Sequence, residues 1–311
     1  KNNKNNNLSI NTDSLGDYMN LQYIPAPKTI YKDCFKLPPG SLLEIDLNKF
    51  KFKDSISFQS LINQEGVDFT KYWNLEFKKQ IYRNKNYTEV KNTTEELIKK
   101  SVKKQMLSDV PIGAFLSSGV DSSLIVSMMQ KLKGNTETFT IGYKSNKLNE
   151  AIEAKQISNF LGTKHNEFIF NSSDLIDLVE EVPYAYSEPF ADSSQIPTMM
   201  ISKLASQTVK VILSGDGGDE VFGGYNRYII ANRYWKFYKY FPKNIKNIIL
   251  KLIKFAPINF LNIFLRNFTN NNNLYKSLNK LKSINNENDY YYSMVNEWSD
   301  VNKILNTNNN T

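Results

Sequence analysis

The sequence predicts an α/β protein in which a parallel sheet is flanked by helices and followed by a helical C-terminal part. Three observations lead to this prediction. Short apolar segments alternate with segments of helical periodicity between residues 93 and 215. Two glycine- and serine-rich segments each come directly after a predicted strand. The chain has 311 residues, which is enough for one large domain or two.

The alternation begins near Thr93. Thr93 or Thr94 followed by Glu95 is typical of a helix start, and apolar residues continue at helical spacing to Leu107. A short apolar run then predicts the first strand, and a helix and a segment rich in β-forming residues follow it. The predicted elements are a helix over 93–107, a strand over 112–116, a helix over 122–132 and a strand over 136–143.

The same alternation continues to residue 215. A helix that ends at Gly162 has the glycine expected at a helix C-terminus. The remaining elements are helices over 149–162, 172–182 and 194–207, strands over 165–170 and 208–215, and mostly helical sequence from 224 to about 282. Right-handed crossovers place the carboxyl ends of parallel strands at one edge, where ligands bind. We therefore expect the two glycine-rich segments to meet at that edge.

Residues 1–71 precede this pattern. Residues 1–14 are polar and predict a disordered tail, and residues 15–65 are short segments bounded by turns. Ser41–Phe52 alternates weakly between apolar and polar residues, which predicts a pair of strands with a turn near Asn48. We expect residues 1–71 to be a tail and connector and residues 72–311 to be one domain.

The composition excludes several kinds of site. The chain has one cysteine, Cys34, and one histidine, His165, so an internal disulfide, a cysteine-rich zinc site and a multi-histidine metal site are excluded. The low cysteine content predicts a reducing compartment, the cytoplasm. Residues 1–14 lack the apolar core of a signal peptide, and Ile248–Leu265 contains lysines and a proline. We therefore expect no membrane-spanning segment.

The net charge of +8 raises the question of a polyanionic partner. Arg233–Phe255 interleaves basic and aromatic residues, a pattern that could bind RNA or a membrane surface. The lysines are scattered rather than grouped in blocks, which favours solvated faces and helix packing with the lysine stems along apolar surface. We expect neither nucleic acid nor membrane as a partner.

The first segment that indicates chemistry is FLSSGVDSS, Phe115–Ser123, between a predicted strand and a predicted helix. Small residues let the backbone turn sharply and direct several N–H groups to one point, and the helix N-terminus adds partial positive charge. This arrangement suits a phosphate group. Asp121 within such a cradle requires a cation such as Mg²⁺. The alternative is a helix cap with incidental serines.

The second segment is LSGDGGDEVFGGYNRY, Leu213–Tyr228, which follows the last predicted strand. It combines two glycine pairs with the acidic residues Asp216, Asp219 and Glu220. Acidic side chains this close repel one another, so a cation or a cationic substrate is expected beside them. The alternative is a solvated acidic turn.

Together, the two segments resemble a known family. FLSSGVDSS resembles the SGGxDS pyrophosphate-binding loop of the ATP pyrophosphatase superfamily, and SGDGGDEVFGGY resembles the second signature of its asparagine synthetase branch. TFTIGY, HNEF and EPFADSSQIPT match that branch in order and spacing, and YIPAPKTIYKDCFKLPPGSLLEI resembles the end of its glutaminase domain. The resemblance covers roughly Leu15–Tyr234. It implies an adenine nucleotide alpha hydrolase-like, Rossmann-like fold.

The chain departs from the family pattern in three ways. Ser118 stands where the second glycine of the first loop is usual, and Asp216 stands where a glutamate is usual. The family's N-terminal cysteine nucleophile, its glutaminase fold and its far C-terminal part are absent. The resemblance therefore implies a central part of a longer protein, with residues 1–71 as the connector from a missing glutaminase domain. Residues 72–311 would be the ATP-binding domain, truncated at its C-terminal end.

The resemblance implies a glutamine-hydrolysing asparagine synthetase that uses ATP and Mg²⁺. ATP would adenylate aspartate and release pyrophosphate, and ammonia from glutamine would then displace AMP. The implied roles are phosphate binding by Ser117, Ser118, Gly119, Ser122 and Ser123, adenine contact by Leu116 and Ile141, lining of the nucleotide and adenylate site by Ser214 and Gly215, Mg²⁺ binding by Asp121 and Asp219, and guidance of the ammonia step by Asp216.

The acceptor substrate is open at this stage. Glu188 and Asp192 could hold an α-ammonium group. No arginine lies between Asp174 and Tyr225, so a carboxylate clamp would be Lys203 or a residue outside this segment. The alternatives are an amidotransferase acting on a sugar, peptide or lactam precursor, and a non-catalytic nucleotide-binding remnant. The oligomeric state also stays open, with a homodimer among the possibilities.

Overall fold

The computed structural model describes residues 8–51, 57–76, 86–144, 149–240, 242, 245, 284, 286–298, 301 and 305. The chain divides into two compact units. The first unit consists of residues 1–74, 188–191 and 226–311, and the second consists of residues 75–187 and 192–225. The division predicted at residue 71 stays a prediction about the domains of the longer protein.

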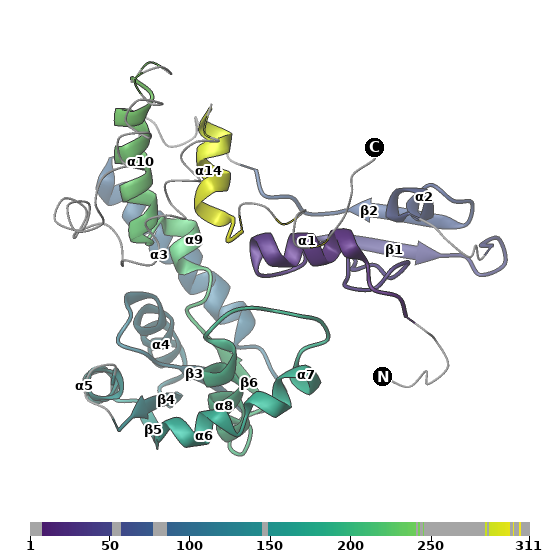
Figure 1. Ribbon diagram of the computed structural model, residues 1–311. Coiled ribbons are helices and arrows are strands. Elements are labelled where there is room, and N and C mark those ends of the chain that lie inside the picture. Colours follow the sequence, from purple (N-terminus) through teal and green to yellow (C-terminus); the bar gives the residue numbers. More distant parts are fainter. Residues whose placement is uncertain are drawn as a thin grey trace. The chain divides into compact units, whose positions relative to one another are not determined.

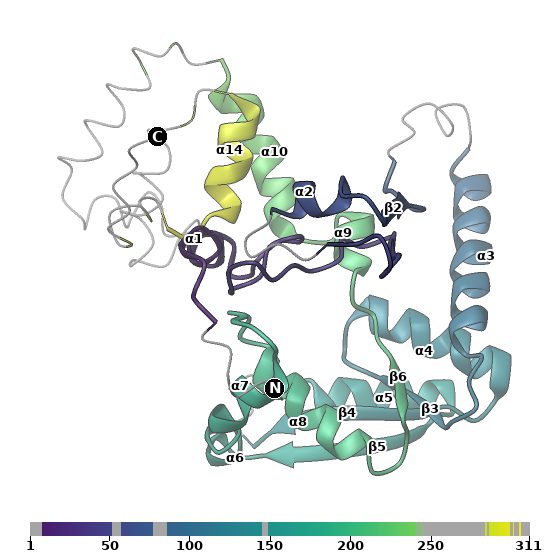
Figure 2. The same cartoon turned by 90° about the vertical axis from the view of Figure 1, so that its right-hand side faces the viewer.

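The second unit is built on a four-stranded parallel sheet with the order β5-β4-β3-β6 (Figures 1 and 2). Its strands are β3 (Ile112–Phe115), β4 (Glu137–Tyr143), β5 (Lys164–Phe170) and β6 (Val211–Leu213). The chain starts at β3, moves outward through β4 and β5, and returns to place β6 on the other side of β3. The predicted parallel sheet is therefore confirmed, and its order reverses between β3 and β6.

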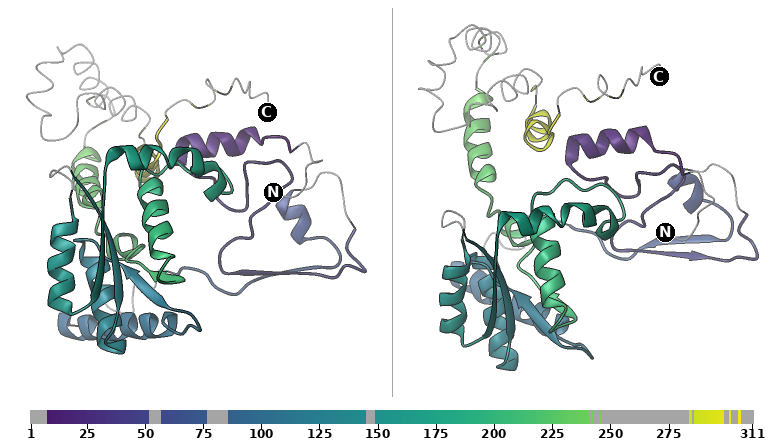
Figure 3. Two further views of the ribbon diagram at one scale, coloured as in Figure 1. Left: turned by 90° about the horizontal axis from the view of Figure 1, so that it is seen from below. Right: turned by 60° about the horizontal axis from the view of Figure 1, so that its bottom comes forward.

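Helices cover both faces of this sheet (Figure 3). Helices α3 (Tyr87–Gln105), α4 (Val120–Lys133) and α5 (Ala151–Leu161) pack on one face around a core that includes Val126 and Met129. Helix α8 (Gln195–Ala205) packs on the other face around Phe139. Ile112 and Ala114 face the first core and Phe115 faces the second, as the two-residue period of a strand requires.

Helix α3 starts six residues earlier than predicted. The Asn86 side chain accepts a hydrogen bond from the Glu89 amide at 2.8 Å and caps the helix at Asn86. The hydroxyl groups of Thr93 and Thr94 instead donate to the carbonyls of Glu89 and Val90, one turn back, and cap nothing. The remaining helices around the sheet lie within a few residues of their predicted ranges, with one exception.

The exception is the helix predicted over 172–182. It is divided into α6 (Ser172–Ile176), a 3₁₀ turn (Val179–Glu181) and α7 (Val182–Ala185). Pro183 lies in the first turn of α7, where its missing N–H is tolerated, and a continuous helix would lose a hydrogen bond there. The strand predicted over 208–215 is shorter as well, because the amides of Thr208 and Val209 donate to the Ala205 carbonyl at the end of α8.

The N-terminal part of the first unit corrects two predictions. Helix α1 (Thr12–Leu21) starts within the predicted disordered tail, because Asn11 accepts hydrogen bonds from the amides of Asp13 and Ser14. The strand pair with a turn near Asn48 is wrong. Strand β1 (Ser41–Ile45) pairs antiparallel with β2 (Val67–Lys71), and helix α2 (Phe58–Ile62) lies between them in the sequence.

The C-terminal part of the first unit contains α10 (Asn226–Tyr238) and α14 (Glu287–Val295), which lie side by side in Figures 1 and 2. Trp235 stacks on Tyr290 with ring centroids 5.4 Å apart. Helix α10 confirms the start of the predicted helical region, and 246–283 lies outside the described residues. The same holds for most of Arg233–Phe255. Among the described helices, none is long and apolar enough to cross a membrane.

Candidate functional site

The two loops predicted to carry chemistry follow neighbouring strands. In the pairing of β3 with β6, Ala114 lies opposite Leu213, so both strands end at the same edge of the sheet. This is the point where the strand order reverses, which is where ligands bind in open parallel sheets. The expectation that the two loops meet at the carboxyl edge is confirmed.

Two glycines of the second loop lie against the start of α4. A Cβ atom on Gly215 would lie 2.6 Å from the amide nitrogen of Ser122, and one on Gly218 would lie 2.5 Å from a carboxylate oxygen of Asp121. Such distances are far below van der Waals contact, so a larger residue at 215 would displace backbone. The second loop therefore packs directly on the first.

Hydroxyl groups fix the shape of the first loop. The Ser122 hydroxyl lies 2.9 Å from that of Ser117, accepts from the Ser117 amide at 3.2 Å and donates to the Gly119 carbonyl. The Ser123 hydroxyl also donates to Gly119, at 2.8 Å. Ser122 is only 9% exposed. The hydroxyls of Ser117, Ser122 and Ser123 therefore form hydrogen bonds within the loop. Ser118 is the exposed serine of this loop.

The amides at the start of α4 stay the predicted anion-binding part of this loop. Gly119 is the N-cap residue and provides no side-chain cap. The first N–H groups of a helix have no intrahelical partner, and they combine with the positive end of the helix dipole. Helix α4 has fourteen residues, and its N-cap residue Gly119 is exposed. A phosphate group is one of the anions that such a helix N-terminus can bind.

The three predicted acidic residues occupy different positions. Asp121 is half-buried against Gly218, and the Asp219 carboxylate turns toward Gly224 within its own loop. Asp216 is exposed, and one of its oxygens accepts a hydrogen bond from the Ser214 hydroxyl at 2.9 Å. Asp121 and Asp219 thus come from two loops that touch.

The residues present fit Mg²⁺ bound together with a phosphate. In the described part of the chain, no group of three or more acidic, histidine or cysteine residues could hold a metal ion. Mg²⁺ is usually bound by one or two carboxylates, with waters and substrate phosphates completing the octahedron. Asp121 and Asp219 provide this number and kind of donors, so a metal held by them would depend on the nucleotide for part of its coordination.

The two predicted adenine contacts lie deeper than the loops. Leu116 is 2% exposed, its N–H donates to the Phe139 carbonyl, and its carbonyl accepts from the Thr140 hydroxyl. Ile141 is half-buried beside Phe139 on the α8 side of the sheet. Adenine contact by Leu116 and Ile141 stays a prediction, as does lining of the nucleotide site by Ser214 and Gly215.

The two predicted substrate residues are already engaged. Asp192 accepts a hydrogen bond from the Ser194 amide at 2.8 Å. Glu188 forms an ion pair with Lys36 and accepts from the Ile30 amide at 3.2 Å. Substrate binding by Glu188 stays a prediction. In the structure, Lys36 neutralises the charge of the Glu188 carboxylate.

Lys203 does not reach the loops. It lies in the last turn of α8 and pairs with Glu181 at 3.1 Å. Helix α8 leads into β6, so the end of α8 lies at the edge of the sheet where strands begin, opposite the loops. The same edge holds His165, the second residue of β5, whose Nδ1 lies 3.0 Å from the Thr138 hydroxyl. Neither residue is placed for chemistry at the loops.

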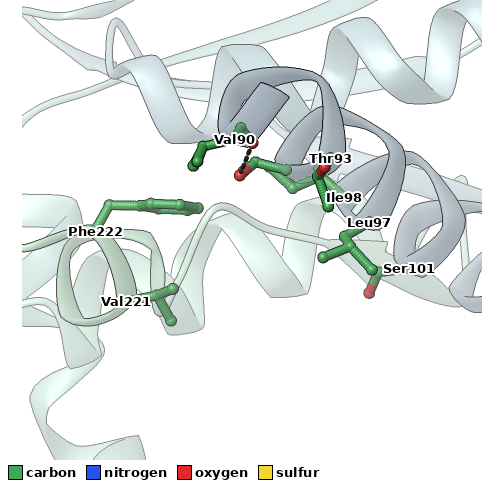
Figure 4. A pocket seen from close by; sticks show the side chains of 8 residues that line it. Val90, Thr93, Leu97, Ile98, Ser101, Val221 and Phe222 are labelled. Carbon is green, nitrogen blue, oxygen red and sulfur yellow. Dashed lines mark hydrogen bonds between the residues drawn. The ribbon is translucent and has the colours of Figure 1, made fainter. Parts of the chain in front are cut away.

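An apolar groove beside the second loop was not found by sequence analysis. It lies between α3 and α9 (Gly218–Phe222) and has a volume of about 420 Å³. The ring of Phe222 points across it toward Val90 (Figure 4). The sequence carried one signal, the adjacent apolar pair Val221 and Phe222 in an otherwise polar loop.

A helix N-terminus and an acidic loop that meet at the switch point of a parallel sheet are typical of nucleotide-binding α/β proteins. Comparison with known sequences makes this class more specific. The chain belongs to the asparagine synthase family, whose pattern matches residues 93–308.

Relatives of known name support the same family. A putative glutamine-hydrolyzing asparagine synthetase 2 of Methanocaldococcus jannaschii is 36% identical over 246 residues, which are 78% of this chain and 44% of the relative. A glutamine-hydrolyzing asparagine synthetase 1 of Bacillus subtilis is 30% identical over 81% of this chain and 37% of its own length. The chain thus spans less than half of either relative. Among solved structures, an NH3-dependent NAD synthetase from Campylobacter jejuni matches 45% of this chain and 61% of its own, with 13% identity and a TM-score of 0.31.

Proposed function

We propose that this chain is the synthetase part of an ATP-dependent, amide-forming ligase that adenylates a carboxylic acid, with aspartate as the acceptor. The observation that carries the proposal is the contact between the two loops. The helix N-terminus after β3 would offer amides to phosphate oxygens. Gly218 of the loop after β6 lies against Asp121, so Asp121 and Asp219 come from loops that touch. ATP and an acid acceptor need this combination of anion-binding amides and carboxylates.

The reaction would proceed in two steps. In the first, a carboxylate oxygen of the acceptor bonds to the α-phosphorus of ATP while the bond to the bridging oxygen of pyrophosphate breaks. In the second, ammonia attacks the acyl carbon and loses a proton, and AMP leaves. The amides of the first loop would hold the leaving pyrophosphate, with Ser117, Ser118, Gly119, Ser122 and Ser123 forming the loop. Asp216, whose side chain is exposed, would guide the ammonia step.

Mg²⁺ bound by Asp121 and Asp219 would offset the charge that develops on the departing pyrophosphate, an effect worth several kcal/mol. The protein's own contribution is to keep both carboxylates in place. We expect close packing of Gly215 and Gly218 on α4 to contribute to this, because the second loop cannot withdraw without losing those contacts.

The acceptor and the ammonia source are inferred from the relatives. Their names include glutamine hydrolysis, and this chain covers 44% and 37% of the two relatives compared. We propose that a glutaminase domain in the same polypeptide supplies ammonia, and that residues 1–71 connect it to the synthetase domain. Asp192 would contact the acceptor's ammonium group. A cytoplasmic location stays a prediction.

The test is ATP–pyrophosphate exchange by the full-length protein, without ammonia, against a panel of acids led by aspartate. Exchange that depends on aspartate would establish adenylation of this acceptor. Exchange with a different acid, such as a lactam precursor, would keep the chemistry and replace the acceptor. Measurable ATP binding without exchange for any acid would contradict the proposal and favour a non-catalytic nucleotide-binding remnant.

A further inference from the structure

The chain between α7 and α8 makes a short excursion into the other compact unit. Residues 188–191 belong to the first unit, whereas the residues immediately before and after them belong to the second. The excursion ends one residue before Asp192. Its contacts with the N-terminal segment therefore bear on how the chain that carries Asp192 is held.

Glu188 is the centre of these contacts. One of its carboxylate oxygens pairs with the Lys36 ammonium, and the other accepts a hydrogen bond from the Ile30 amide at 3.2 Å. Lys36 also donates to the Ile24 carbonyl at 2.5 Å. The Glu188 side chain is 21% exposed and that of Lys36 is 35% exposed. The pair is thus partly shielded from water, where ion pairs are screened less than at the surface.

The far end of the excursion is fixed by backbone. The Ala191 amide donates to the Gln22 carbonyl at 2.9 Å. Ile24 and Ile30, which flank this region of the N-terminal segment, are 2% and 7% exposed, so the segment that receives the excursion is itself packed. The excursion is therefore anchored at both ends, by Glu188 and by Ala191.

We infer that Glu188 is a positioning residue, which anchors the chain before Asp192 to the N-terminal segment through Lys36 and the Ile30 amide. The inference rests on the proposed function for its link to the acceptor, since Asp192 is placed there at the acceptor's ammonium group. We expect loss of this anchor to weaken binding of the acceptor beside Asp192. In this inference Lys36 and the Ile30 amide, and not the acceptor amino acid, are the partners of the Glu188 carboxylate.

The experiment compares Glu188→Gln and Lys36→Met with the matched control Lys28→Met in the full-length protein. Lys28→Met removes an exposed ion pair with Asp17, 2.7 Å long, in the same N-terminal segment. Hydrogen exchange of the Ala191 amide should be at least tenfold faster in Glu188→Gln and Lys36→Met, and unchanged in the control. The KM for the acid in pyrophosphate exchange should rise about tenfold in the same two variants, with kcat and the KM for ATP nearly constant.

Further variants separate the alternatives. Lys36→Arg, which keeps the charge, and the swapped pair Lys36→Glu with Glu188→Lys should restore both measurements at least in part. If Glu188 binds the acceptor directly, Glu188→Gln raises the KM while Lys36→Met does not, and Ala191 exchange is unchanged in both. That result would overturn the inference. A wild-type protein without pyrophosphate exchange would refute the proposed function, and Ala191 exchange would still decide the inference.

Discussion

At the scale of single residues, Asp121 is the side chain on which the proposed chemistry depends most directly. Its carboxylate lies where the two loops touch. In Asp121→Asn the side chain keeps its size and loses its charge, so Mg²⁺ and pyrophosphate would no longer be held together. We expect pyrophosphate exchange to fall about 10²-fold or more, the range found when one group stabilising a transition-state charge is removed. Steady-state exchange assays at saturating ATP measure this.

Asp109→Asn is the matched control for this substitution. Asp109 is exposed and precedes β3, at the edge of the sheet opposite the loops. Its variant should exchange pyrophosphate at the wild-type rate. Equal activity of Asp121→Asn and Asp109→Asn would show that Asp121 holds no metal that the reaction requires.

His165 is predicted to make stability depend on pH. Burial lowers the pKa of His165 below 6.5, Lys155 lowers it further, and the charge of Glu167 partly opposes them. Its Nδ1 pairs with Thr138, while its Nε2 is buried without a partner in the described structure. A neutral imidazole is thus favoured in the folded protein. Its contribution to the free energy of unfolding is complete above pH 6.5 and is lost as the pH falls through the lowered value.

Urea unfolding at a series of pH values between about 5 and 7.5 measures this effect. The wild-type free energy of unfolding should decrease toward the acid end, and His165→Gln should show a flatter profile over the same range. An equally steep decrease in His165→Gln would assign the pH dependence to other groups.

At the scale of elements, the approach of the second loop to α4 determines whether the site exists. In Gly215→Ala a Cβ would lie 2.6 Å from the Ser122 amide nitrogen and 2.9 Å from the Asp121 carbonyl carbon, both of them backbone atoms that cannot rotate away. The loops would have to separate. We expect ATP binding to weaken at least tenfold, measured by calorimetric titration with Mg²⁺ and ATP.

Gly134→Ala provides the contrast. Gly134 ends α4 with a φ of +73°, and within the described part of the chain a Cβ on this residue would have no neighbouring atom within 4 Å. Alanine in this left-handed conformation costs roughly 1–2 kcal/mol of backbone strain and touches no loop. Stability should fall slightly while ATP affinity stays unchanged. If both glycine variants bind ATP equally, close packing of the loops is not required for the nucleotide.

At the scale of the whole molecule, nucleotide binding should stabilise the fold. A ligand that binds only the native state raises its stability by RT ln(1 + [L]/Kd), which is about 2.7 kcal/mol at a hundredfold excess over Kd. Thermal unfolding with ATP and Mg²⁺ should therefore shift upward relative to ATP alone. The extra shift due to Mg²⁺ should be absent in Asp121→Asn. A Mg²⁺-dependent shift of equal size in that variant would contradict the assignment.

The parallel sheet, the positions of the two loops and their meeting at one edge could all be predicted from the amino-acid sequence. Periodicity and glycine placement are local signals, and the rule that parallel strands end together converts them into a site. Local signals gave the wrong helix start or strand pair where another capping residue or another strand partner was present. Asn86 starts α3 ahead of Thr93, and no local pattern shows that β1 pairs with β2 across a long connection.

Which side chains are free to act depends on packing, and no local pattern contained that information. Ser122 has a hydroxyl that suits phosphate binding, but neighbours distant by up to five residues use it to shape the loop. Lys203 is separated from the loops by the length of α8, and Glu188 is paired with Lys36, 152 residues away in sequence. The sequence gives the type of each residue. Its electrostatic partner is set by packing between segments that lie far apart in the chain. That partner determines whether a charged side chain binds substrate or stabilises the fold.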